Sequence, residues 1–247
     1  IYEGIRATRK QWPGIATELR TILRQIREKD KDWPQVAALR AEDFFPQPSL
    51  QTFSELRKAA EQAGVWPEVR AVAIHYLETG ELFRFTKKTT VNVNMLPWPL
   101  PQTGLEETTE VHRRDFPMTG TLIDIAISEK NPDEVLRWYD LGKPKSTFGM
   151  WTWFQEDKIA QAIADTYPDR AVSIWKKLAE GQIAQSQPKA YEVAIGFLRK
   201  LRSTLKKLGR EGDWQSYLTQ LRQANIRKKR LMELLDSLAD GRIIKAK

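Results

Sequence analysis

The segment from 189 to 208 carries a regular hydrophobic pattern. Its apolar residues recur at alternating intervals of three and four positions, and lysine and arginine fill much of the opposite side. This spacing places the apolar side chains on one face of an α-helix. The apolar positions are Tyr191, Ala194, Leu198, Leu201, Leu205 and Leu208. The pattern therefore predicts an amphipathic helix that must pack against further helices.

A second apolar stripe begins after Gly209 and Gly212, which interrupt the first one. If this stripe continued as one helix, Asn225 and Lys228 would fall on its apolar side. We expect the helix to break near Ala224–Asn225, and the alternative is that Lys228 reaches from the apolar face to solvent. The stripe contains Trp214, Leu218 and Leu221, then Leu231, Leu235 and Leu238.

Proline marks many of the predicted helix starts, because the first helical position needs no backbone N–H partner. An aromatic residue or asparagine precedes proline at 12, 33, 66, 131 and 167. Further predicted start signals are caps at Ser49, Asn131 and Asp213, and a capping box from Thr152 to Gln155. Predicted stop signals are Gly64 and Gly80.

The spacing of these starts suggests the fold class. Successive starts lie 21, 33, 65 and 36 residues apart, and several of these gaps are close to the roughly 34-residue period of two-helix repeats. The pattern predicts an all-α chain built as an irregular αα-hairpin superhelix of the TPR or HEAT kind. A plain helical bundle whose helices begin with proline is the alternative.

The predicted organisation has three parts. Residues 1–85 are expected to form N-terminal helical hairpins, and 119–247 C-terminal helical repeats ending in two long helices. Residues 86–118 are expected to form an irregular, proline-rich insertion that crosses between them, and we expect the three parts to make up one continuous solenoid domain. Within the insertion, 86–93 is expected to be a short strand or a loop. Residues 96–101 are expected to be polyproline II, either laid over the protein's own surface or docked on a partner.

Composition adds a basic region to this picture. The net charge of the chain is +8, and 199–230 contains 11 basic residues against Glu211 and Asp213. Such asymmetry is typical of nucleic-acid surfaces, although a solvated outer helix face explains it as well. The candidate nucleic-acid or anion-binding residues are Arg199, Lys200, Arg202, Lys206, Lys207, Arg227, Lys228, Lys229 and Arg230.

Candidate catalytic chemistry is sparse. The chain has no cysteine and 2 histidines, His75 and His112, neither with a second ligand at metal-binding spacing. We therefore expect no catalytic, cofactor-binding or metal-binding residue in this chain, and no small-molecule substrate. No apolar run reaches the roughly 18 residues of a membrane span, so we expect a cytoplasmic protein with no membrane partner. Because the first residue is Ile1, we expect a fragment of a longer protein.

Three passages resemble the helical region that follows the zinc-binding motif in bacterial SWIM zinc-finger proteins. They are AEQAGVWPEVRAVAIHYLETG at 60–80, LIDIAISEKNPDEVLRWYD at 122–140, and the segment 167–238 that opens with YPDRAVSIWKKLAE. The family's Cys-x-Cys and Cys-x-His motif is absent. The resemblance therefore implies that any zinc site lies upstream, and that this part is an interaction module of a protein thought to contact DNA or other proteins.

Two functions follow as hypotheses. The first is a non-catalytic helical-repeat scaffold that holds a protein partner on a concave helical face. The second is a nucleic-acid-binding helical domain that uses the basic face of 199–230, whose phosphate contacts would be strongly salt-dependent.

Overall fold

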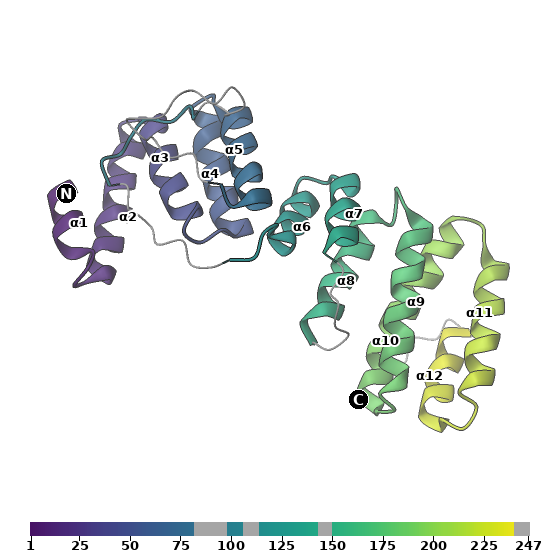
Figure 1. Ribbon diagram of the computed structural model, residues 1–247. Helices are drawn as coiled ribbons and strands as arrows, with labels where there is room; N and C mark the ends of the chain where they lie inside the picture. The colour runs from purple at the N-terminus through teal and green to yellow at the C-terminus, as the bar shows by residue number, and fades with distance from the viewer. Residues whose placement is uncertain (82–97, 106–113, 143–149, 240–247) are drawn as a thin grey trace. The chain divides into compact units, whose positions relative to one another are not determined.

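The computed structural model describes residues 1–81, 98–105, 114–142 and 150–239 (Figure 1). Within these ranges the chain is all-helical and contains no strand, which confirms the prediction of an all-α chain. The helices are α1 (Tyr2–Thr8), α2 (Pro13–Lys29), α3 (Trp33–Phe44), α4 (Leu50–Gln62), α5 (Trp66–Thr79), α6 (Thr119–Ser128), α7 (Pro132–Leu141), α8 (Met150–Ile163), α9 (Pro168–Ala184), α10 (Pro188–Lys207), α11 (Glu211–Ala224) and α12 (Lys229–Ala239).

Proline occupies the first or second position of six of these helices, α2, α3, α5, α7, α9 and α10. The predicted starts are therefore confirmed. The Ser49 side chain accepts a hydrogen bond from the Thr52 N–H, and Thr52 completes a capping box. Asn131 likewise accepts from the Glu134 N–H at the start of α7. These bonds satisfy backbone donors that have no partner inside the helix.

Two predicted caps are wrong. Helix α11 begins at Glu211, so Asp213 lies in its first turn and pairs with Arg210, with the Nε and Oδ2 atoms 2.7 Å apart. Helix α8 begins at Met150, which places Thr152 inside the helix. Both residues have the cap chemistry, but the helical hydrogen bonds start before them. The predicted break after Ala224 is confirmed, since α11 ends there and α12 begins at Lys229.

The chain folds into two compact units, Ile1–Ile125 and Ala126–Lys247. In the first unit, helices α1 to α5 pack in chain order, each against the next. The core contains Leu39, Phe44, Phe53, Leu56 and Tyr76, all nearly inaccessible to solvent. Burial of these large side chains supplies the main stabilising free energy of the unit.

The described part of the proline-rich insertion lies on the first unit. Leu100 and Leu105 are buried, and the Arg6 guanidinium donates to the Gly104 carbonyl at 2.7 Å. The Trp98 ring lies 5.8 Å from that of Phe45. Residues 98–105 therefore cover the unit's own surface, one of the two expected roles. The expected strand or loop at 86–93 and the first two residues of the polyproline segment fall outside the described residues.

In the second unit, consecutive helices again pack as neighbours: α7 with α8, α8 with α9, α9 with α10, and α10 with both α11 and α12. Helices α9 and α10 lie side by side (Figure 1). Helix α10 is the centre of this end of the unit, and Leu198, Leu201 and Leu205 from the predicted stripe are buried. Leu208, the last stripe position, is 42% exposed because α10 ends at Lys207. Among the helices described, none has the length and apolarity that a membrane crossing requires.

Candidate functional site

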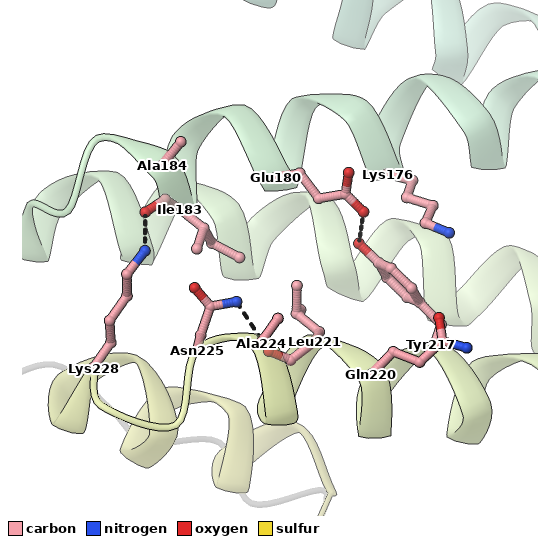
Figure 2. Close-up of a pocket in the computed structure, with 10 residues that line it drawn as sticks. All are labelled: Lys176, Glu180, Ile183, Ala184, Tyr217, Gln220, Leu221, Ala224, Asn225 and Lys228. Atoms are coloured by element: carbon pink, nitrogen blue, oxygen red, sulfur yellow. Dashed lines mark hydrogen bonds between the residues drawn. The ribbon is translucent and has the colours of Figure 1, made fainter.

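A groove lies between α9 and α11, the two helices that flank α10 (Figure 2). Its volume is about 370 Å³. Its apolar lining consists of Ile183 and Ala184 from α9 and of Leu221 and Ala224 from α11. The Ile183 and Leu221 side chains form the apolar middle of the groove (Figure 2). The remaining lining residues are Lys176, Glu180, Tyr217, Gln220, Asn225 and Lys228.

One end of the groove is bridged by Tyr217 and Glu180. The Tyr217 hydroxyl donates to the Glu180 carboxylate at 3.1 Å. Lys176 Nζ lies 4.4 Å from the centroid of the same tyrosine ring, a cation–π distance. Burial raises the pKa of Tyr217 above its ordinary value, and the Glu180 charge and hydrogen bond raise it further. Tyr217 is thus a neutral hydrogen-bond donor, held in a fixed position.

The opposite end is bridged by Lys228, as Figure 2 shows. Its Nζ donates to the Ile183 carbonyl at 2.9 Å, near the C-terminus of α9, where a cation is electrostatically favourable. Asn225 Nδ2 donates to the Leu221 carbonyl at 2.9 Å where α11 ends. The break in the helix therefore frees Lys228 to reach across the groove, and Lys228 does not lie on a continuous apolar face.

The structure gives five of the nine predicted basic residues a partner. Lys200 Nζ lies 2.6 Å from Asp157 Oδ2, and the Arg202 guanidinium donates to the Leu238 carbonyl. Lys207 lies 3.5 Å from Asp165, and Arg230 lies 3.1 Å from Glu233. Lys228 bonds the Ile183 carbonyl as described above. These interactions neutralise or occupy much of the predicted basic face.

The other four predicted residues are exposed, and the described residues offer them no hydrogen bond or ion pair. Arg199 and Lys206 lie seven positions apart on α10, which places them on one side of that helix. Arg227 and Lys229 lie at the connection between α11 and α12. The nine residues therefore do not form a single face of free cations.

The most buried acidic groups of the second unit join helices rather than line a reaction centre. Glu156 is 6% exposed and accepts from the Tyr139 hydroxyl at 2.8 Å and from Lys177 Nζ at 2.8 Å. Burial raises the pKa of Tyr139, and the hydrogen bond to Glu156 adds to the rise. This cluster links α7, α8 and α9 and leaves the Glu156 carboxylate engaged by two donors.

The histidines offer no ligand set in the described ranges. His75 Nε2 lies 3.4 Å from Glu81 Oε2 near the surface, and His112 falls outside the described residues. No group of three or more His, Asp or Glu side chains that could hold a metal ion is present among the residues the structure describes.

Sequence analysis missed Lys176, Glu180 and Tyr217 as parts of a site. Tyr217 and Glu180 are 37 positions apart, and no local pattern signals that contact. The available signal is their separation of 37 positions along the sequence, which is close to the roughly 34-residue period of a two-helix repeat. No protein-family model, curated protein or solved structure matches this chain, so the SWIM resemblance stays a prediction.

Proposed function

We propose that this chain is a non-catalytic helical-repeat scaffold that holds a segment of a partner protein. The groove between α9 and α11 carries the proposal, because it combines an apolar middle with polar ends and is open to a ligand. Such a combination is typical of sites that recognise another molecule by shape and a few polar contacts. The buried Glu156 carboxylate, in contrast, is engaged by donors from two other helices.

We also propose that the helices form an irregular αα-hairpin superhelix. Helices α1 to α5 and α7 to α11 pack in chain order, as an irregular αα-hairpin superhelix of the TPR or HEAT kind requires, and such stacks bind partners on a concave face. We further propose that this chain is a fragment of a larger SWIM-type zinc-finger protein. The full-length reading frame tests that origin, which requires a Cys-x-Cys motif upstream of Ile1.

Panning a phage-displayed random-peptide library against the purified chain tests the scaffold function. We expect enrichment of a peptide family whose synthetic members bind in fluorescence anisotropy. If no family is enriched over an unrelated helical protein, the scaffold proposal is wrong.

A nucleic-acid-binding function is the second candidate, and the free cations favour it. Arg199 and Lys206 are exposed on one side of α10 without an acidic partner among the described residues. Two such cations would contact phosphate groups without reading sequence. Salt-dependent binding to a DNA duplex tests this function.

A further inference from the structure

The connection between α11 and α12 combines an exposed apolar side chain with cations that lack acidic partners. Ile226 is 73% exposed. Arg227 and Lys229 beside it are also exposed, and the described residues give neither an ion pair. The neighbouring Arg222 and Arg230 do have acidic partners, at 2.7 Å from Asp236 and 3.1 Å from Glu233. Among these neighbouring cations, Arg227 and Lys229 are therefore the ones whose charge is not balanced by an acidic partner.

Helix α12 adds to the local positive charge. Its first turn contains Lys229 and Arg230 and no acidic residue. Because the N-terminus of a helix already carries a partial positive charge, cations there are electrostatically unfavourable. A negatively charged ligand at this connection would relieve that repulsion.

One end of the groove is lined by residues of this connection, Asn225 and Lys228. Lys228 bridges one end of the groove and follows Arg227 in the chain, so the cationic connection and the apolar groove are continuous. An ammonium group has three donors, and Lys228 uses one of them on the Ile183 carbonyl. Its other two N–H groups have no hydrogen-bond acceptor among the described residues, and the same ammonium lies 6.0 Å from the centroid of the Tyr191 ring.

The dimensions of the groove limit what can enter it. Along α9 it extends from Lys176 to Ala184, which at the helical rise per residue corresponds to about 12 Å. Its volume of about 370 Å³ accommodates an apolar side chain with its neighbours and not a long helix. Ala184 and Ala224 line the groove near Lys228, and both are exposed and carry only a methyl group as their side chain.

We infer that the groove and the Asn225–Lys229 connection together bind a short acidic peptide segment of a partner protein. An aliphatic or aromatic side chain of the segment enters between Ala184 and Ala224, and adjacent carboxylates pair with Lys228, Arg227 and Lys229. A peptide fits better than a nucleic acid, because a phosphate backbone would gain nothing from the apolar middle of the groove, whereas an apolar side chain of a peptide would be buried there. This inference rests on the scaffold function proposed above and names the partner's chemistry.

Random-peptide panning on the full chain and on matched variants tests the inference. The groove-filling variant is Ala184→Tyr, and its control is Ala162→Tyr, which adds the same bulk at an exposed alanine near the end of α8. The charge variant is R227E/K229E, and its control is R199E/K206E on α10. Circular dichroism confirms that each variant is folded before binding is measured.

We expect the enriched peptides to pair Asp or Glu with an aliphatic or aromatic residue. Their affinity should fall roughly tenfold or more for A184Y and for R227E/K229E, and change about twofold or less for the two controls. Peptides without acidic bias, or with equal affinity for A184Y, would overturn this inference and leave the scaffold function standing. Absence of any enriched family would overturn both. Displacement of the peptide by a DNA duplex through Arg227 and Lys229 would assign the connection to nucleic acid instead.

Discussion

Lys200 Nζ on α10 lies 2.6 Å from Asp157 Oδ2 on α8, two helices earlier in the chain. The Asp157 carboxylate also accepts a hydrogen bond from Trp175 Nε1 on α9 at 2.9 Å. Asp157 is therefore the point at which three successive helices are joined. Lys200, a candidate for binding nucleic acid by sequence, has this carboxylate as its partner.

Replacing Asp157 by alanine should destabilise the second unit. The change leaves the buried Trp175 N–H without an acceptor, and an unsatisfied buried donor costs about 1–3 kcal/mol. The half-exposed Lys200 adds little to this loss, because water screens it. Urea unfolding followed by tryptophan fluorescence measures the effect.

Asp165→Ala is the matched control for that experiment. Asp165 is almost fully exposed and pairs with Lys207 at 3.5 Å, so its removal should change the unfolding free energy by no more than about 0.5 kcal/mol. Equal destabilisation by the two substitutions would show that Asp157 does not join the helices as described.

The free energy of unfolding should fall at high pH because of Tyr139 and Tyr217. Burial raises the pKa of both side chains in the folded chain, and hydrogen bonds to Glu156 and Glu180 add to the rise. In the unfolded chain a tyrosine loses its proton near pH 10, at about its ordinary value. Above that pH the folded state binds more protons than the unfolded state, so stability decreases as pH rises.

Urea unfolding at pH values from about 8 to about 11 measures this dependence. The double variant Y139F/Y217F should show a smaller loss of stability over the same range, because neither position can ionise in the unfolded chain. All other groups titrate alike in the two proteins, so identical pH profiles would argue against the raised tyrosine pKa values.

Alanine substitutions at Gly181 and at Gly80 should change the free energy of unfolding in opposite directions. Gly181 lies in α9, and an added Cβ meets no atom there, so Gly181→Ala should stabilise by about 0.5–1 kcal/mol. Gly80 has φ +78°, and its added Cβ would lie 2.6 Å from Phe116 Cε2. Gly80→Ala should therefore destabilise by more than about 1 kcal/mol.

Gly64→Ala separates the two causes of the destabilisation expected at Gly80, which are backbone strain and the contact with Phe116. Gly64 has φ +73° and open space around it, so its substitution reports backbone strain alone. We expect a loss of about 1 kcal/mol, smaller than at Gly80. Thermal unfolding of the intact chain provides the comparison. A loss at Gly64 as large as at Gly80 would mean that the Phe116 contact contributes nothing.

If the second candidate function is right, binding to a DNA duplex should weaken steeply with salt. Removing one cation that pairs with a phosphate should lower the slope of log K against log salt by roughly 0.9, so R199E/K206E should lower it by about 2. Gel-shift titrations at several salt concentrations measure the slope. The same substitution pair should leave peptide binding intact, and an unchanged DNA slope would remove Arg199 and Lys206 from any nucleic-acid surface.

Local sequence signals predict where most of the described helices begin and which faces they bury. Pro13, Pro168 and the Ser49 cap act within one turn of their own helix, so their effect is local. The stripe from Tyr191 to Leu205 is likewise buried as its spacing predicts. The predicted cap at Asp213 is wrong because the cap chemistry of an aspartate does not require that a helix start there.

Which charged side chains are free depends on contacts between helices that are distant in the sequence. Lys200 and Asp157 are 43 positions apart, and Lys228 reaches a carbonyl 45 positions away, so neither contact has a signature in the local sequence. Arg227 and Lys228 are adjacent and chemically alike, yet Lys228 bridges the groove while Arg227 is exposed. The periodicity of the sequence fixes the direction in which a side chain leaves its own helix. The partner of that side chain depends on which other helix packs beside it.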